Sequence, residues 1–212
     1  ARLDRLFKSY GRYLGHPVTS DEDVYCTEKS NGRADQALAS QLHDSNIIDI
    51  ESDEALELYY KQSSILVNCY DLALIGATLA NNGINPITGE CALESHCVPK
   101  VLSVISSCGM NDLSGEWIFK VGMPAISCVS GGLLAILPGQ FGLAVFSPQL
   151  DNFNNSIRGI LVCKTFSSGF GLHIFHTSRS SAASVIHATY DAAQVPSKRT
   201  RSNEQIRLLS EL

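Results

Sequence analysis

Residues 106–132 read SSCGMNDLSGEWIFKVGMPAISCVSGG, and this stretch decides the fold of the chain. A helical segment ends at Cys108-Gly109, and a polar turn follows it. The aromatic and β-branched residues of 116–121 predict a strand. Next, residues 127–132 (SCVSGG) lead into a second apolar strand. Because small residues and glycines let backbone N–H groups approach a ligand closely, we expect main-chain donors here that bind a carbonyl oxygen.

The segments on both sides of this stretch predict an α+β fold. Downstream, residues 131–138 and 141–147 predict two further strands, and their short connections make the three strands antiparallel. Residues 156–168 predict a returning helix. Upstream, the spacing of apolar residues predicts five helices, at residues 3–14, 34–42, 53–62, 70–82 and 95–107. We therefore expect an antiparallel sheet packed against a helical cluster, with a cleft between the cluster and the sheet edge.

Length and charge exclude several classes of protein. The chain has 212 residues, enough for one domain of moderate size with a real core. Its net charge of −5 argues against a nucleic-acid surface. The longest apolar run, 129–146, is interrupted by Pro138-Gly139-Gln140, so it predicts two buried strands rather than a membrane span. We expect neither nucleic acid nor membrane as a partner.

Cysteine usage and the last residues indicate the cellular setting. The seven cysteines form no Cys-x-x-Cys pair and lie mostly among apolar or small neighbours. This pattern predicts reduced thiols and a cytoplasmic protein. Residues 177–212 are rich in Ser, Arg and Ala, with one possible helix at 183–193, and we expect a linker or tail there.

Two residues are candidates for chemistry by type and setting. Tyr59 follows a helix face that contains Leu56, and a tyrosine can relay protons if a cation lowers its pKa. The alternative is a half-buried structural tyrosine. Glu28 opens the polar segment 28–32, which we expect to be a loop. Its carboxylate could bind a substrate ammonium group, or the segment could simply be solvated.

Other motifs are absent from the sequence. His173 and His176 could offer two metal ligands, but no further ligand lies near them in sequence, so we expect no metal. No glycine-rich phosphate loop is present, and we expect no cofactor. Ser-x-x-Lys, which places a nucleophile and its base on one helical turn, does not occur at any of the seven lysines.

Four runs then carry a resemblance to a known family: VNCYDLALIGATLANNGINPITGE (67–90), SSCGMNDLSGEW (106–117), GMPAISCVSGGLLAILPGQFGLAVFSPQLDNFNNSIRG (122–159) and FGLHIF (170–175). They closely resemble the serine-dependent glutaminases, which are L-glutamine amidohydrolases on a β-lactamase/transpeptidase-like fold. The resemblance covers residues 3–176. It implies that the side-chain amide of L-glutamine is hydrolysed to L-glutamate and ammonia through a serine acyl-enzyme.

The resemblance also implies roles for five residues. Tyr59 matches the first active-site tyrosine of the family, and Glu28 matches the carboxylate that binds the substrate α-amino group. Val129 matches the residue whose backbone N–H helps to form the oxyanion hole. Asp35 stands where the family has a substrate-binding Asn, and Asn111 stands where it has a second active-site Tyr.

Departures from the family pattern have physical consequences. Asn111 can orient a ligand but cannot relay protons as a tyrosine does. Ile126 and Cys128 replace the Lys and Gly of a Lys-Ser-Gly motif, and Ile126 removes a cation from the cleft. Asp35 adds a negative charge near a substrate carboxylate, which is unfavourable unless Asp35 is protonated or paired.

Three functional hypotheses follow. The first is a glutaminase of which this chain is the C-terminal two-thirds, with Ser-x-x-Lys on a segment before Ala1. The second is a catalytically inactive, glutaminase-like binding or assembly subunit, which Asn111, Ile126 and Cys128 favour. The third, another β-lactamase-like acyl-transferase, is disfavoured by Ile126 and by the missing Ser-x-x-Lys.

The same reading gives the expected organisation of the chain. We expect a glutaminase-like domain at residues 1–176, incomplete at its N-terminus, and a C-terminal linker or tail at 177–212 that leads towards an absent regulatory domain. Without the nucleophile-bearing helix, apolar faces would remain uncovered. We therefore expect a homo-oligomer, a dimer or a tetramer.

Overall fold

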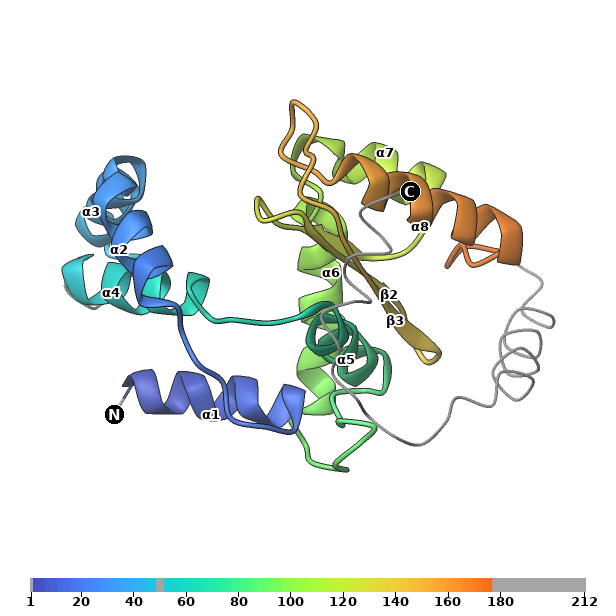
Figure 1. Ribbon diagram of the computed structural model, residues 1–212, viewed down its shortest axis with the longest axis horizontal. Helices are drawn as coiled ribbons and strands as arrows, with labels where there is room; N and C mark the ends of the chain where they lie inside the picture. Colours follow the sequence, from blue (N-terminus) through green and yellow to red (C-terminus); the bar gives the residue numbers. More distant parts are fainter. Residues whose placement is uncertain (1, 49–51, 177–212) are drawn as a thin grey trace.

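The computed structural model describes residues 2–48 and 52–176, which form a helical, N-terminal part and a sheet covered by helices (Figure 1). The α-helices are α1 (Arg2–Leu14), α2 (Glu22–Asn31), α3 (Arg33–Asp44), α4 (Ser52–Ser63), α5 (Cys69–Ala80), α6 (Val98–Cys108), α7 (Ser114–Lys120) and α8 (Ile157–Phe170). Two short 3-10 helices, η1 (Ser95–Cys97) and η2 (Asn111–Leu113), precede α6 and α7. The strands are β1 (Ala125–Ser127), β2 (Gly132–Leu137) and β3 (Phe141–Phe146).

The three strands form an antiparallel meander in the order β1-β2-β3. Ala125 pairs with Ala135, and Ala135 pairs in turn with Leu143. Every residue of β2 is buried. A continuous apolar run such as GLLAIL is what a central strand covered on both faces requires, because neither set of alternating side chains meets water.

The alternating side chains of β2 point into two different cores. Leu133, Ala135 and Leu137 pack with Trp117 of α7 and Cys163 of α8. The opposite set, Leu134 and Ile136, packs against α5 and α6. The sheet is thus the middle of three layers, with α5 and α6 on one side and α7 and α8 on the other (Figure 1). The expected α+β arrangement of an antiparallel sheet and helices is confirmed.

Close approach of α5 to the sheet depends on two glycines. A Cβ atom on Gly142 of β3 would lie 2.4 Å from the backbone N of Ala77, and one on Gly76 would lie 2.6 Å from Leu134 Cδ1. Both positions therefore exclude a side chain.

Helices α2, α3 and α4 form a separate small cluster, which Figure 1 shows apart from the sheet. Its core consists of Tyr25, Ala39, Leu56 and Tyr60. The two segments that join it to the rest pair with each other: Leu66 N–H donates to Thr19 O at 2.9 Å, and Asp21 N–H donates to Ser64 O at 2.8 Å.

One predicted strand is wrong, because residues 114–120 form helix α7. Trp117 and Val121, four residues apart, both enter the core beside the sheet. On the other side of this turn Lys120 forms an ion pair with Glu116, which lowers the pKa of the Glu116 carboxyl. The spacing of four residues between Trp117 and Val121 indicates a helix, whereas the β-branched and aromatic composition of 116–121 indicates a strand. Here the spacing, and not the composition, predicts the observed structure. The first strand of the meander lies further on, at Ala125–Ser127.

The expected polar loop at residues 28–32 is also wrong. Residues 28–31 form the last turn of α2, and Asp21 caps the first turn by accepting hydrogen bonds from the N–H groups of Asp23 and Val24. Only Gly32 separates α2 from α3. Glu28 is consequently presented by a helix, so its position is fixed by the packing of α2.

The remaining helices and strands agree with the sequence within a few residues. The helix expected at 70–82 ends where Asn82 and Gly83 adopt positive φ values of 57° and 86°. No helix among the described residues has the length and apolar character to cross a bilayer. The expected helix at 183–193 lies outside the described residues.

Candidate active site

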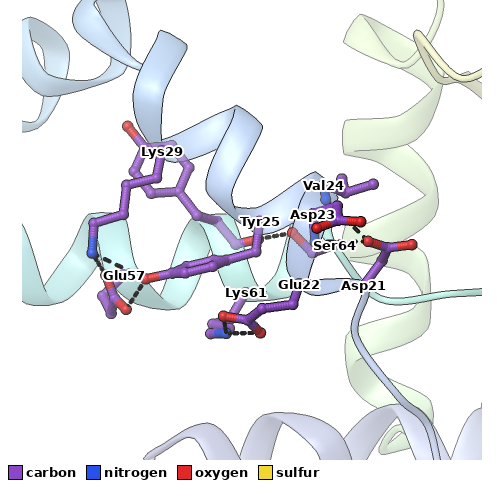
Figure 2. Close-up of polar contacts among 10 residues, drawn as sticks. Asp21, Glu22, Asp23, Val24, Tyr25, Lys29, Glu57, Lys61 and Ser64 are labelled. Carbon is purple, nitrogen blue, oxygen red and sulfur yellow. Dashed lines mark hydrogen bonds and ion pairs between the residues drawn. The ribbon is translucent and has the colours of Figure 1, made fainter.

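A network of charged and aromatic side chains holds α2 against α4 (Figure 2). Lys29 Nζ donates to Tyr25 Oη at 3.0 Å and to Glu57 Oε2 at 2.8 Å. The Tyr25 hydroxyl donates to the other Glu57 oxygen. These hydrogen bonds raise the pKa of Lys29 and lower the pKa of Glu57, so both groups are charged at neutral pH.

Lys61 closes the other side of the same network. Its Nζ lies 3.6 Å from the centroid of the Tyr25 ring and donates to Glu22 Oε2 at 2.8 Å. The hydrogen bond to Glu22 raises the pKa of Lys61. A cation over the ring face is attracted by the ring quadrupole, so Tyr25 is held through both its ring and its hydroxyl.

Three of the candidate residues lie together on this cluster. Glu28 is on α2, Asp35 on α3 and Tyr59 on α4. Burial raises the pKa of the neighbouring Tyr60 hydroxyl, and Asp35, Tyr59 and Glu28 each raise it further. The structure therefore brings these three predicted residues into one region.

Tyr59 and Tyr60 have opposite environments. Tyr60 is 2% exposed, and its hydroxyl donates to Gly32 O at 3.3 Å. The Tyr59 side chain is 50% exposed, and its ring meets that of Tyr60 edge to face with centroids 5.7 Å apart. Tyr60 is thus the buried, structural tyrosine of the pair, and Tyr59 remains accessible to a ligand.

Asn111 lies at the start of η2, between α6 and α7. Its φ of 52° is left-handed, a conformation that asparagine tolerates better than most residues. Its Nδ2 donates to Phe153 O at 3.0 Å. The buried Asn155 donates in turn to Met110 O at 3.3 Å, so the loop that follows β3 is tied to the segment between α6 and α7.

Val129 occupies the turn between β1 and β2, with its side chain 73% exposed. In that turn the Cys128 N–H donates to Gly132 O at 2.8 Å and the Gly131 N–H donates to Cys128 O at 2.9 Å. Within the described ranges 2–48 and 52–176, the Val129 N–H donates to no backbone acceptor. It is therefore a backbone donor that a ligand could use.

The candidate residues consequently form two groups. No hydrogen bond or ion pair among residues 2–48 and 52–176 joins Glu28, Asp35 or Tyr59 to Asn111 or Val129. Ile126, on β1 beside the Val129 turn, is 38% exposed.

The network around Tyr25 was missed by the sequence analysis. Part of it carried a signal, because Tyr25 and Lys29 on α2 and Glu57 and Lys61 on α4 are spaced four residues apart and so share a helix face. The pairing between the two helices depends on tertiary packing, which spacing alone does not reveal.

The decisive comparison is with protein families. The sequence model of the family described as Glutaminase matches residues 1–175. The chain belongs to the glutaminase family. Both groups of candidate residues lie within the matched range, so the resemblance expected from the four sequence runs is confirmed.

Curated glutaminases match over most of this chain. It is 47% identical over 174 residues to the glutaminase of Trichormus variabilis, which covers 82% of this chain and 52% of that protein. It is 40% identical over 208 residues to glutaminase 1 of Bradyrhizobium diazoefficiens, which covers 98% of this chain and 34% of that protein. The chain thus spans about half or less of the length of these two glutaminases.

Solved glutaminase structures share the fold. Mglu superimposes with a TM-score of 0.80 at 39% identity, covering 84% of this chain and 44% of Mglu. The Bacillus subtilis glutaminase YbgJ, in its covalent complex with 5-oxo-L-norleucine, gives 0.79 at 30% identity over 82% of this chain and 62% of YbgJ. The three layers described above are therefore part of the β-lactamase-like fold of glutaminases.

A metal site was not expected from the sequence. The part of the chain that the structure describes contains no group of three or more His, Cys, Asp or Glu side chains arranged to hold a metal ion.

Proposed function

We propose that this chain contributes to hydrolysis of the side-chain amide of L-glutamine, giving L-glutamate and ammonia through a serine acyl-enzyme. One observation carries the proposal: the glutaminase match over residues 1–175 includes both the α2–α4 cluster and the Val129 turn. The YbgJ complex adds support. That protein reacted with 6-diazo-5-oxo-L-norleucine, whose carbonyl at position 5 corresponds to the side-chain amide carbon of glutamine.

The α2–α4 cluster would recognise the amino-acid end of the substrate. Glu28 binds the α-ammonium group through an ion pair, and the accessible hydroxyl of Tyr59 relays protons or orients the substrate. Asp35 lies in the same region and adds a second negative charge. That charge favours the substrate ammonium group and disfavours its carboxylate.

The Val129 turn would act at the amide. The Val129 N–H, which donates to no backbone acceptor in the part of the chain that the structure describes, is a donor for the oxygen that becomes negative when a nucleophile attacks the amide carbon. Asn111 orients a ligand through its side-chain amide but carries no proton to transfer at neutral pH. The serine nucleophile and its lysine belong to a Ser-x-x-Lys motif, which does not occur in these 212 residues.

The first experiment separates binding from turnover. Isothermal titration calorimetry of the 212-residue chain with L-glutamate should show binding, and an ammonia assay with L-glutamine should show no release. Tyr59→Phe should weaken L-glutamate binding, whereas Tyr70→Phe, a second exposed tyrosine, should leave it unchanged. If the chain releases ammonia from L-glutamine and Tyr59→Phe abolishes that release, the predicted inactivity is refuted. Absence of any L-glutamate binding would refute the proposed substrate site.

The alternative function is a catalytically inactive binding or assembly subunit. Asn111, Ile126 and Cys128 favour it, because they replace a proton-transferring Tyr, a cation and a glycine of the family pattern. A chimera that carries this chain in place of the matching residues of the Trichormus variabilis glutaminase tests the choice. Ammonia release by that chimera supports the enzyme. An inactive chimera that gains activity only with Asn111→Tyr, Ile126→Lys and Cys128→Gly supports the inactive subunit.

We further propose a cytoplasmic homo-oligomer, a dimer or a tetramer, built from a glutaminase-like domain at 1–176 and a linker or tail at 177–212. All seven cysteines are free thiols, as a reducing compartment favours. Exposed apolar side chains such as Phe146 and Leu161 offer surface for self-association.

A further inference from the structure

A groove with a volume of about 740 Å³ runs along α1, away from the two groups of candidate residues. One wall is the α1 helix, and the other is formed by residues 15–18 together with Glu90. Figure 1 shows the loop that follows α5 passing beside the C-terminal end of α1. Sites for small organic ligands have volumes of roughly 300–1,000 Å³, so this groove is within their range.

Three cations of α1 line this groove. Arg5, Lys8 and Arg12 are spaced three and four residues apart, which places them on one helix face, and all three are exposed. None of them forms an ion pair with a carboxylate of residues 2–48 or 52–176. Like charges at this spacing destabilise a helix, so an anion between them would remove a repulsion that the fold leaves in place.

The opposite wall is fixed by buried hydrogen bonds. Asn85, which is fully buried, donates through Nδ2 to Arg12 O at 3.0 Å and to Tyr13 O at 2.9 Å. Its Oδ1 accepts from the N–H groups of Ile87 and Thr88. His16 lies 2.9 Å from the buried Asp71. The backbone at the C-terminal end of α1 and in residues 85–88 is therefore held in place by buried hydrogen bonds.

The lining indicates the class of ligand. Three cations and the single carboxylate of Glu90 leave a charge of +2, which matches a phosphate ester carrying about −1.5 to −2 charges at pH 7. Guanidinium groups bind phosphate through two parallel hydrogen bonds. Phe7, Pro17 and Val18 supply apolar surface in the same groove. An inorganic ion would leave that surface and most of the volume unused.

We propose that this groove binds a small organic phosphate, with its phosphate groups on Arg5, Lys8 and Arg12 and its organic body against Phe7, Pro17 and Val18. The proposal is independent of glutamine hydrolysis. It concerns a different surface and requires no turnover, so either proposal can fail without the other.

The test is calorimetric titration of the 212-residue chain with ADP as the organic phosphate, and with inorganic phosphate and adenosine as its two parts. We expect ADP to bind at least about tenfold more tightly than either part. The triple variant Arg5→Gln/Lys8→Gln/Arg12→Gln should raise the Kd for ADP by about tenfold or more. Glutamine keeps high helix propensity, so α1 should form normally, and circular dichroism verifies this.

A matched control changes the same charge elsewhere. Lys100→Gln/Arg158→Gln/Lys164→Gln alters three exposed cations outside the groove, and it should leave the Kd for ADP unchanged within about twofold. No ADP binding, equal binding by the groove variant, or equal loss in the control would each overturn the proposal. Inorganic phosphate that binds as tightly as ADP would also overturn it, because the apolar lining would then have no role.

Discussion

A single hydrogen atom at Gly32 decides how closely α2 and α4 approach each other. The backbone of Gly32 is ordinary, with φ of −75°. A Cβ atom there would lie 1.8 Å from the Tyr60 hydroxyl oxygen, and that hydroxyl is buried against the same residue. The requirement for glycine therefore comes from the neighbouring helix and not from the local conformation.

Gly32→Ala should destabilise the chain by about 1–3 kcal/mol, because Tyr60 must leave its position and the core of the α2–α4 cluster must repack. Urea unfolding followed by circular dichroism measures the change. Gly115→Ala in α7 is the control: a Cβ there meets nothing within 4 Å, so its stability should be equal or slightly higher. Equal destabilisation by both variants would contradict the steric argument.

Asn111 combines a strained backbone with a side-chain contact, and two variants separate these contributions. Asn111→Tyr, the change towards the family pattern, should reduce the free energy of unfolding by about 1–2 kcal/mol. Tyrosine is strained at a φ of 52°, and the hydrogen bond to Phe153 O is lost. Asn111→Gly loses the same bond but keeps the conformation without strain. It should be less destabilised than Asn111→Tyr in urea unfolding, and the reverse order would contradict the strain argument.

At the scale of elements, the Tyr25 network makes the packing of α2 on α4 depend on pH. The folded pKa of Glu57 is below its ordinary value of 4.5, because Lys29 and Tyr25 bind the charged form. Because the folded pKa is lower than the unfolded pKa, the charged Glu57 carboxylate stabilises the folded protein at pH values above the unfolded pKa. That contribution is complete above about pH 4.5 and is lost as the pH falls through the folded value.

Glu57→Gln should therefore reduce stability at pH 7 and have less effect near pH 3. Because Glu57 and Lys29 are 46% and 54% exposed, solvent screens the pair, and we expect a loss of no more than about 1 kcal/mol. Urea unfolding at several pH values measures it. Glu116→Gln removes an exposed ion pair within one helix and should cost less than Glu57→Gln. A pH-independent effect of Glu57→Gln would contradict the linkage.

Elements were predictable where periodicity and composition agreed. The apolar run of β2 and the turn at Pro138-Gly139-Gln140 were readable, because each signal acts within a few neighbouring residues. α7 was misread because Trp117 and Val121, which enter the core one helical turn apart, are residue types that also favour strands. Tyr59 and Glu28 were candidates by residue type as well as by family resemblance, whereas Asp35, Asn111 and Val129 came from the resemblance alone. The grouping of Tyr59, Glu28 and Asp35 around Tyr60 depends on contacts between helices, which no local pattern contains.

At the scale of the whole molecule, β3 forms an edge of the sheet that the structure describes. Its sequence, FGLAVF, contains no charge or proline that would discourage pairing with another chain. Phe146 at its end is 51% exposed. Pairing of β3 with a second copy of the chain would bury this edge and Phe146, as the proposed homo-oligomer requires.

Phe146→Lys should shift the chain towards monomer, because a lysine beside the open edge opposes strand pairing. Sedimentation velocity at several concentrations measures the distribution. Phe119→Lys on α7, where the side chain is 81% exposed, adds the same charge away from the edge and should leave the distribution unchanged. A shift caused by Phe119→Lys alone would place the self-association on α7 instead.

The pairing of the two segments that join α2–α4 to the rest determines how this part of the molecule opens. Thr19 and Leu66 are hydrogen-bonded across the junction, as are Asp21 and Ser64. Neither segment can move away without breaking its hydrogen bonds to the other, so local opening must involve both segments together. The three helices should therefore behave as one cooperative unit in native-state hydrogen exchange, with their slowest amides exchanging together and before those of β2.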